Sequence, residues 1–254
     1  MTLYMIGIGL NDEEDITIKG LKKIKESDYV FLEVYTSKLQ VVMKRLESFY
    51  NKKIIAADRD LVEQRADEIL SKAKTKKVSF LVVGDVFGAT THTDLFLRAK
   101  EKGVEVEIIN NASILNAVGV TGLELYKFGK TTSIPYKEHN FRPETAYDVL
   151  KSNQKSGLHT LILLDIKPDR NMTVNEAIKI MLEIENKRKE KVFTNNSMIL
   201  GCARLGGDYK IKYGKVSELE NEDFGKPLHC LIVPGKLHFM EEEALAMWKV
   251  STKK

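Results

Sequence analysis

The chain has 254 residues, of which 43% are hydrophobic and 30% charged, so it is long enough for two compact domains with a substantial core. Its net charge of +4 is small beside 40 Lys and Arg and 36 Asp and Glu residues, which excludes an argument for nucleic-acid binding from charge alone. With only two cysteines, a disulfide scaffold is excluded. Because no signal peptide and no apolar run of about 20 residues is evident, we expect a soluble, cytoplasmic protein.

Short apolar segments alternate with amphipathic segments over the first 110 residues. Predicted strands cover 3–8, 29–34, 53–57, 78–83 and 104–109, and predicted helices cover 16–25, 41–50, 61–73 and 93–102. The strand at 78–83 is almost entirely apolar, which is typical of a central parallel strand that is covered on both faces. This alternation predicts an N-terminal α/β lobe over residues 1–112 with a mainly parallel sheet.

The second part of the chain has a different pattern. A connecting helix that then turns is predicted over 111–126, strands over 131–134, 158–166, 198–203, 209–216 and 228–233, and helices from Arg142 to about 156, from 174 to about 189 and over 241–249. Thr173 followed by Glu176 is a capping-box pattern for the middle helix. Because several strands follow one another without helices, residues 113–254 are predicted to form a C-terminal α/β lobe with a mixed sheet.

Two glycines, Gly7 and Gly9, follow the first strand and match the beginning of the dinucleotide fingerprint G-x-G-x-x-G. Asp12 occupies the position of the third glycine. Four carboxylates at 12–15 would repel a pyrophosphate, which such sites bind with free amides at a helix N-terminus. The segment either accommodates a neutral or cationic ligand, or is a glycine turn before an acid-rich helical turn; both interpretations stay open.

The segment GDVFGATTHTD, residues 84–94, is the most distinctive of the chain. It leaves the central strand at its carboxyl end, where ligands bind in open α/β sheets. Gly84 and Gly88 allow the backbone to approach a ligand closely, and Asp85 offers a hydrogen-bond acceptor. The sequence therefore predicts a ligand-binding loop here.

The alternative is a plain strand–turn–helix connection, with Thr91 or Thr93 as the helix N-cap. That explanation accounts for one or two of the polar residues but not for the whole cluster. His92 by itself is more often a structural hydrogen-bonding residue than a catalytic one.

Further polar turns lie at the ends of other predicted strands. Ser113 either caps the next helix, contacts a ligand, or does both, and Asp165 follows a strand without an evident role. Cys202 and Cys230 lie in apolar segments and are interpreted as small buried hydrophobic residues. The chain has no Ser-His-Asp or Cys-His order and no HExxH, CxxC or Walker motif, so no metal site is predicted.

Seven segments of the chain, in order and over nearly its whole length, carry a family resemblance. They are LYMIGIGLNDEEDIT (3–17), YVFLEVYTS (29–37), GDVFGATTHTDL (84–95), NASILNAVGVTGLELYKFGKTTSIP (111–135), GLHTLILLDIK (157–167), MTVNEA (172–177) and DFGKPLHCLIVPGKLHFMEEEAL (223–245). The chain resembles the diphthine synthases, which are diphthamide-pathway methyltransferases of the tetrapyrrole methylase superfamily. ATTHTD and VTGLELYKFGK distinguish this family from the corrin-ring methylases, and Val86 stands where the family usually has proline.

The resemblance implies two α/β lobes with S-adenosylmethionine in the cleft between them, and a homodimer. It implies cofactor contacts at Leu10, Asp85, Gly88, Ser113, Ile114, Leu164, Leu205 and His229. Apolar residues of this set would line the adenine and methionine, and Asp85 would lie near the ribose or the amino-acid end. A sulfonium cofactor is cationic and has no phosphate, which is compatible with the acids at 12–15.

The implied reaction is successive methylation of the amino group of a 3-carboxy-3-aminopropyl-histidine on translation elongation factor 2, giving diphthine; eukaryotic members also add a methyl ester. Catalysis would depend on positioning and on a dry site. The amine must be deprotonated to attack, so a proton acceptor or a water path is expected, and His92 and His229 are candidate acceptors.

Two alternatives stay open at the level of the sequence. One is a methyltransferase that acts on a corrin precursor, which would share the fold and the cofactor. The other is a non-catalytic basic binding protein that uses lysine faces such as Lys22, Lys23 and Lys25. Because these lysines alternate with acids, they are typical of a solvated helix face.

Overall fold

The computed structural model describes residues 1–137 and 143–250. The chain divides into two compact units, Met1–Ala117 (unit 1) and Val118–Lys254 (unit 2). The predicted division at 112/113 lies a few residues before this one. Within the described ranges, every helix is too short or too polar to cross a bilayer.

Unit 1 contains a five-stranded sheet in which all neighbouring strands are parallel. The strands are β1 (Thr2–Gly7), β2 (Tyr29–Glu33), β3 (Ile55–Ala57), β4 (Val78–Val82) and β5 (Glu105–Ile109), in the order β3-β2-β4-β1-β5. Ile6 near the end of β1 is paired with Leu81 of β4 and with Ile109 of β5. The carboxyl ends of these three strands therefore lie at one edge, and the predicted parallel sheet is confirmed.

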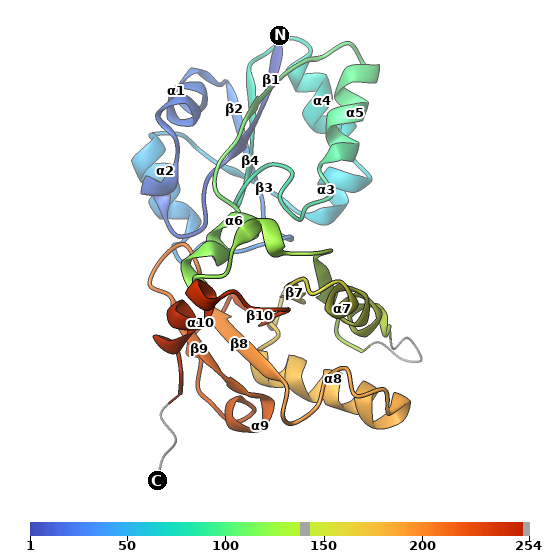
Figure 1. Ribbon diagram of the computed structural model, residues 1–254. Coiled ribbons are helices and arrows are strands. Elements are labelled where there is room, and N and C mark those ends of the chain that lie inside the picture. Colours follow the sequence, from blue (N-terminus) through green and yellow to red (C-terminus); the bar gives the residue numbers. More distant parts are fainter. Residues whose placement is uncertain (138–142, 251–254) are drawn as a thin grey trace. The chain divides into compact units, whose positions relative to one another are not determined.

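Helices cover both faces of this sheet (Figure 1). They are α1 (Ile18–Glu26), α2 (Met43–Tyr50), α3 (Arg59–Glu63), α4 (Asp67–Ala73) and α5 (Thr93–Glu101), with a 3-10 turn η1 (Glu13–Asp15) before α1. Successive strand residues point to opposite faces. Ile6 packs with Ile24 of α1 on one face, and Met5 packs with Leu70 of α4 on the other.

One predicted helix of unit 1, over residues 61–73, is divided into α3 and α4. Arg65 lies at the break and joins the two helices, since its Nε lies 2.6 Å from Asp60 Oδ2 and its Nη1 lies 2.7 Å from Glu68 Oε1. The prediction of one continuous helix is wrong because this turn is stabilised by side-chain pairing and contains no glycine or proline that would signal it.

Unit 2 contains a second five-stranded sheet. Its strands are β6 (Thr132–Ile134), β7 (Thr160–Leu164), β8 (Met198–Ala203), β9 (Lys210–Lys215) and β10 (His229–Val233), in the order β6-β7-β10-β8-β9. The β6–β7 pair is parallel, and the other three pairs are antiparallel. The predicted mixed sheet is therefore confirmed.

Four helices accompany this sheet (Figure 1). They are α7 (Thr145–Lys155), α8 (Val174–Arg188), α9 (Val216–Leu219) and α10 (Phe239–Ala246). Tyr147 of α7 and Ile178 of α8 belong to the apolar core of the unit. Thr173 and Glu176 form the predicted capping box, whereas the predicted start of the first helix at Arg142 lies outside the described residues.

Two predicted segments have different bounds in the structure. The connecting segment 111–126 contains only α6 (Ile114–Ala117) and the 3-10 turns η2 (Val118–Thr121) and η3 (Leu125–Lys127), because Gly122 adopts φ +88° and ends any helix there. The last helix, predicted over 241–249, begins at Phe239. His238 sets this start, since its side chain accepts a hydrogen bond from the backbone N–H of Met240 at 3.4 Å.

Candidate functional site

Asp85 lies three residues after β4 at the carboxyl edge of the unit 1 sheet. Its Oδ2 accepts hydrogen bonds from Asn110 Nδ2 (2.9 Å) and the Asn111 backbone N–H (3.0 Å), and its Oδ1 accepts one from the Phe87 N–H (3.0 Å). Partial burial raises the pKa of the Asp85 carboxyl, but these donors lower it below its ordinary value. The Asp85 carboxylate is nevertheless only half-buried, so the donor of a ligand can reach it.

The turn after β1 is closed by its own carboxylate. Gly9 has φ +79°, and a Cβ there would lie 2.3 Å from the Cβ of Asp15, so the turn requires glycine. Asp15 Oδ2 accepts hydrogen bonds from the backbone N–H groups of Leu10 (3.0 Å) and Asn11 (2.8 Å). A phosphate-binding turn would point such amides at its ligand. Here the protein occupies them itself, which agrees with the expectation that this is not a pyrophosphate site.

The neighbouring acids also have structural partners. Asp12 is the N-cap of η1, and its Oδ1 accepts a hydrogen bond from the Glu14 N–H at 2.9 Å. Glu13 is nearly buried, and its Oε1 lies 2.5 Å from Arg45 Nε. The predicted acid-rich first turn therefore exists as a 3-10 turn, in which Asp12, Glu13 and Asp15 stabilise the local fold.

Close backbone contacts join the loops at this edge. A Cβ on Gly88 would lie 2.6 Å from Ser113 Cβ, and one on Gly84 would lie 3.5 Å from Leu10 Cδ2. Ser113 Oγ accepts a hydrogen bond from the backbone N–H two residues later (3.2 Å), so its predicted capping role is confirmed, and Ile114 begins α6. The structure thus gathers, within unit 1, the predicted residues Leu10, Asp85, Gly88, Ser113 and Ile114.

Three predicted site residues lie at one edge of the unit 2 sheet. Leu164 ends β7, His229 begins β10, and Leu205 follows β8 by two residues. The register pairs His229 with Ala203 and places Leu164 beside it. All three residues are nearly buried, and two of the three are apolar.

His229 uses both of its ring nitrogens inside unit 2. The backbone N–H of Val174 donates to Nδ1 (3.4 Å), and Nε2 lies 3.1 Å from the carbonyl oxygens of both Gly225 and Lys226. Two carbonyl acceptors require the proton on Nε2. Burial lowers the pKa of His229, although the two carbonyls partly offset this effect. Neither nitrogen is free to take a substrate proton, so the prediction of His229 as proton acceptor is not supported.

His92 is 1% exposed and lies in the core of unit 1. Its ring centroid lies 5.3 Å from that of Phe80 and 6.2 Å from that of Tyr35, and burial lowers the pKa of the imidazole. The ring packs as an aromatic side chain, and neither of its nitrogens has a hydrogen-bond partner among the described residues, so the predicted hydrogen-bonding role is not supported. His92 is also the N-cap residue of α5 and makes no side-chain cap bond. The alternative that Thr91 or Thr93 is the N-cap is therefore wrong.

The remaining predicted strand-end residues have structural roles. Cys202 and Cys230 are paired across β8 and β10 and are both buried, which agrees with their interpretation as small apolar residues. Asp165 accepts hydrogen bonds from the backbone N–H groups of Tyr136 (2.8 Å) and Ile166 (2.9 Å). It thereby ties the end of β7 to the segment after β6.

A buried carboxylate in unit 2 was not predicted. Glu241 is 0% exposed. Its Oε1 accepts hydrogen bonds from the Glu124 N–H (3.0 Å) and from His159 Nε2 (2.8 Å). Its Oε2 accepts hydrogen bonds from Lys127 Nζ and from the His238 N–H (2.8 Å). Burial raises the pKa of Glu241, but these donors lower it to about 2. The partners are 82 to 117 residues away from Glu241 along the chain, apart from His238, so no local pattern signals this network.

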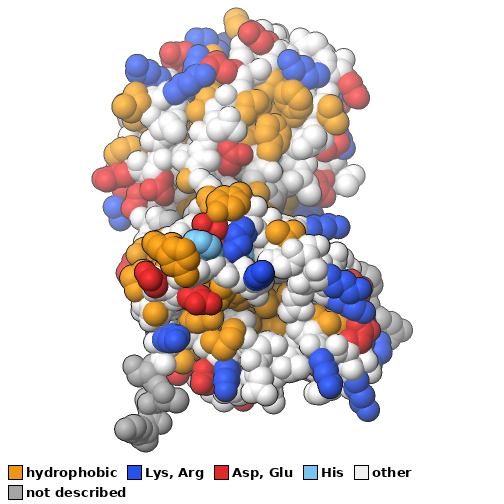
Figure 2. All heavy atoms as spheres, viewed as in Figure 1, with side chains coloured by type: hydrophobic (Ala, Val, Ile, Leu, Met, Phe, Trp, Pro, Cys, Tyr) orange, Lys and Arg blue, Asp and Glu red, His pale blue; other side chains and the backbone are white. Residues whose placement is uncertain are grey.

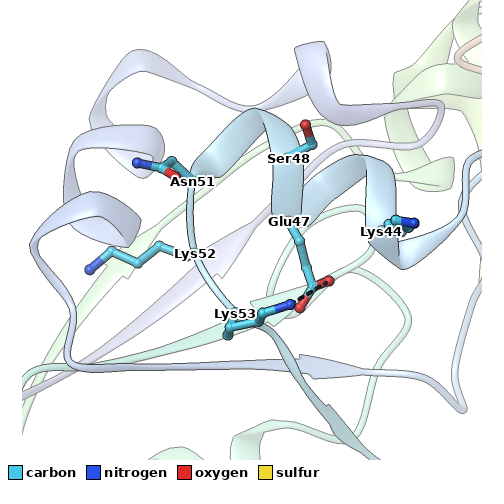
Figure 3. Close-up of a pocket in the computed structure, with 6 residues that line it drawn as sticks. All are labelled: Lys44, Glu47, Ser48, Asn51, Lys52 and Lys53. Atoms are coloured by element: carbon cyan, nitrogen blue, oxygen red, sulfur yellow. Dashed lines mark ion pairs between the residues drawn. The ribbon is translucent and has the colours of Figure 1, made fainter.

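A surface hollow of about 360 Å³ lies at the end of α2 and contains none of the predicted site residues (Figure 3). It is lined by Lys44, Glu47, Ser48, Asn51, Lys52 and Lys53. Lys53 Nζ lies 3.8 Å from Glu47 Oε2, and Lys52 Nζ donates to the Ser27 carbonyl at 2.6 Å. In the part of the chain that the structure describes, three or more His, Cys, Asp or Glu side chains are nowhere grouped as metal ligands would be.

Comparisons with known proteins place these features in a family. The family model of the tetrapyrrole (corrin/porphyrin) methylases matches residues 2–198. The chain is 49% identical over 249 residues to the diphthine synthase of Methanocaldococcus jannaschii, covering 96% of this chain and 97% of the relative. It is 47% identical over 270 residues to the diphthine methyl ester synthase of Dictyostelium discoideum, with 98% and 99% covered. A crystal structure of diphthine synthase superposes with a TM-score of 0.90 at 36% identity, covering 98% of this chain and 96% of the other.

Proposed function

Because the chain belongs to the tetrapyrrole methylase family and is a methyltransferase, we propose that it methylates translation elongation factor 2 with S-adenosylmethionine as cofactor. The acceptor is the amino group of a 3-carboxy-3-aminopropyl-histidine, which is methylated successively to give diphthine. The observation that carries this proposal is the near full-length similarity to diphthine synthases. The enzyme would act in the cytoplasm, where it meets its protein substrate.

The geometry of unit 1 fits a sulfonium cofactor that carries a ribose. Bound S-adenosylmethionine supplies a methyl group activated by the adjacent positive charge. Asp85 is a half-buried carboxylate with a lowered pKa, which suits a ribose hydroxyl or an ammonium group. The amides of Leu10 and Asn11 are bonded to Asp15, so they cannot bind a phosphate group. S-adenosylmethionine contains no phosphate and does not need them.

We propose cofactor contacts at two sets of residues. They are Leu10, Asp85, Gly88, Ser113 and Ile114 in unit 1, and Leu164, Leu205 and His229 in unit 2. The leucines and the isoleucine would offer apolar surface to the adenine and the methionine, with few polar groups to fix the orientation. His229 would donate no hydrogen bond to the cofactor, because its Nε2–H is already bonded to two carbonyl oxygens. It would contact the cofactor only through van der Waals packing.

The chemistry required of the protein is mainly positioning. A neutral thioether leaves when the amine attacks, so the departing group needs no proton. The histidines at 92 and 229 are both buried, and the pKa of each is lowered, chiefly by burial. The proton that the substrate amine loses before each transfer would therefore pass to water and not to these rings.

Mass spectrometry of the product tests the proposal. Elongation factor 2 that carries the unmethylated aminocarboxypropyl group is incubated with the protein and S-adenosylmethionine, and the added methyl groups are counted. Three methyl groups are expected for diphthine, and a fourth that alkali removes would indicate the methyl ester. A corrin precursor serves as the control acceptor. Labelling of the control but not of the elongation factor would overturn the proposal.

We also propose a homodimer that is formed through an apolar surface of unit 2. This α10 surface consists of Val120, Leu125, Tyr126, Phe239, Met240 and Met247. Tyr126, Met247 and Phe239 are 80%, 70% and 61% exposed, and such aromatic and methionine side chains are enriched at interfaces. Figure 2 shows apolar side chains gathered over α10.

The α10 surface is continuous because η2, η3 and α10 pack together. A Cβ on Gly122 would lie 2.2 Å from Ala244 Cβ, and Glu241 accepts from Lys127 and the Glu124 amide. A stable two-fold interface covers about 800 Å² on each partner around an apolar centre, and six exposed apolar side chains are enough for such a centre.

The charges at the rim favour a second copy of the same chain as the partner. Within three residues of these side chains along the chain, the charged residues that are not buried are three acids (Glu124, Glu242 and Glu243) and three lysines (Lys127, Lys236 and Lys249), and they form its rim. This balanced rim would not repel its own copy, whereas a rim of one sign would.

Light scattering tests this assembly, with a dimer expected at twice the chain mass of 28.9 kDa. The double variant Tyr126→Glu, Met247→Glu should be a monomer. Ile18→Glu, at a residue of unit 1 that is 76% exposed, is the matched control and should remain a dimer. A monomeric natural protein, or a dimeric double variant, would contradict the proposed interface.

A further inference from the structure

Asn111 makes the largest number of cross-loop hydrogen bonds at the carboxyl edge of the unit 1 sheet. Its Nδ2 donates to the carbonyl oxygens of Gly7 and Asp15, both at 3.0 Å. Its backbone N–H donates to Asp85 Oδ2 at 3.0 Å, and its Oδ1 accepts from the N–H of Ala112 at 2.7 Å. Every polar group of the Asn111 side chain is therefore used inside the protein.

These bonds connect the ends of three neighbouring strands. Gly7 ends β1, Asp85 follows β4 and Asn111 follows β5, and β1 lies between β4 and β5 in the sheet. The contact is close: a Cβ on Gly7 would lie 3.0 Å from Asn111 Cβ and 3.1 Å from Asp85 Cα. A shift of Asn111 would therefore move both neighbouring loops.

The connection continues from Asn111 to Leu10 through Asp15. Asn111 holds the carbonyl of Asp15, and the carboxylate of Asp15 holds the amides of Leu10 and Asn11. On the other side, Asn111 is one of the three donors that orient Asp85. Leu10 and Asp85, which come from different loops, thus both depend on Asn111. Leu10 depends on its side chain, and Asp85 depends on its backbone N–H.

We propose that Asn111 is a positioning residue of the cofactor site, which holds the loop carrying Leu10 and the loop carrying Asp85 in one fixed arrangement. The proposal rests on the proposed function, because it assigns both loops to S-adenosylmethionine. Both N–H donors of the Asn111 side-chain amide are used within the protein, so neither is available to the cofactor. Asn111 acts by keeping the accessible carboxylate of Asp85 and the side chain of Leu10 in place before the cofactor arrives.

Calorimetry with S-adenosylhomocysteine tests this role. In Asn111→Ala the dissociation constant should rise about tenfold, because the loop that carries Leu10 loses its two side-chain bonds to residue 111 and is no longer held in place. In methyl transfer to elongation factor 2, the KM for the cofactor should rise by a similar factor while kcat changes less than twofold. A purely structural role would lower the fraction of folded protein and leave both constants of the folded enzyme unchanged.

Ser79→Ala is the matched control in the same sheet. Ser79 is buried in β4, and its Oγ lies 2.7 Å from Ser27 Oγ, near the opposite end of the strand from Asp85. This variant should lose a buried hydrogen bond and retain its affinity for S-adenosylhomocysteine. If Asn111→Ala does not fold, Asp15→Ala is the second variant. It removes the carboxylate that holds the amides of Leu10 and Asn11, leaves the Asn111 side chain unchanged, and should weaken binding at least threefold.

Unchanged affinity in the folded Asn111→Ala variant, or in Asp15→Ala where that variant is needed, would overturn the positioning role. An equal loss of affinity in Ser79→Ala would overturn it as well, because the effect would then follow from general destabilisation. If the natural protein does not bind S-adenosylhomocysteine at all, the proposed cofactor itself is wrong. That outcome is visible before any variant is made.

Discussion

Asp85 in unit 1 and Glu241 in unit 2 are both ionised carboxylates, but they are surrounded in opposite ways. Asp85 is partly exposed and accepts three hydrogen bonds from uncharged donors. Glu241 is fully buried and accepts four, one of them from Lys127. Glu241 is therefore inaccessible to a ligand, whereas Asp85 remains accessible. Asp85 can therefore bind a ligand, whereas Glu241 stabilises the fold.

The largest expected effect is the loss of Glu241. Glu241→Ala leaves Lys127 and His159 without their buried partner, and we expect the free energy of unfolding to fall by about 3–5 kcal/mol. Urea denaturation followed by circular dichroism measures this change. Glu242→Ala, at the next and exposed position, is the control and should cost less than about 0.5 kcal/mol. Similar losses in both variants would show that burial does not distinguish the two acids.

The pH dependence of stability should report the same carboxylate. The pKa of Glu241 falls from an ordinary value of 4.5 to about 2 on folding, so its contribution is present above pH 4.5 and is lost as the pH falls through 2. The contribution is on the order of 3 kcal/mol. Denaturation from pH 7 to pH 2 measures it as the difference between the natural protein and Glu241→Gln. A difference that stays constant over this range would be evidence against a strongly lowered pKa.

Asp85→Ala should change ligand binding and leave the fold intact. Loss of a hydrogen bond to a charged group is expected to weaken S-adenosylhomocysteine binding roughly 10- to 100-fold, as measured by calorimetry. The free energy of unfolding should fall by less than about 1 kcal/mol, because water can reach the freed amides. Asp94→Ala, which removes an exposed carboxylate 2.9 Å from Arg98, is the control. An unchanged dissociation constant in Asp85→Ala would remove this residue from the proposed site.

The smallest effect is expected for Glu14→Ala. Glu14 is exposed, and it belongs to the same acidic run as Asp15, which holds two amides. Stability should change by less than about 0.5 kcal/mol, and the affinity for S-adenosylhomocysteine by less than twofold. Thermal unfolding and calorimetry check both values. A large loss of affinity would mean that the acidic run attracts the cationic cofactor through its total charge and not through the geometry of Asp15.

Local patterns predicted the fold well where the structure depends on neighbours in sequence. The apolar run at 78–83 became the central strand β4, and the spacing of Thr173 and Glu176 specified a capping box that forms. The helix break at Arg65 was not predicted, because it is stabilised by two side-chain contacts of Arg65, with Asp60 and with Glu68. Such contacts carry no signal comparable to glycine or proline.

In the candidate site too, residues with a local sequence signal were predicted and residues that act through distant contacts were not. Asp85 and Gly88 stand out in the sequence because a strand followed by a glycine-rich polar loop is a recurrent site of ligand binding. The role of Asn111 depends on Gly7 and Asp15, which are about 100 residues earlier in the chain. Only the pairing of β1 with β4 and β5 brings these residues together, so the sequence alone could not reveal that Asn111 connects them.

The closed turn at Gly9 has a consequence for competition among metabolites. ATP and the nicotinamide dinucleotides share the adenosine group of S-adenosylmethionine but carry phosphates, which are normally bound through free amides. In this chain Asp15 fills the amides of Leu10 and Asn11 with a negative charge of its own. An adenine nucleotide that entered the proposed site would find its phosphates beside a carboxylate and without donors from this turn. The enzyme would thus tolerate abundant nucleotides without needing a separate mechanism to reject them.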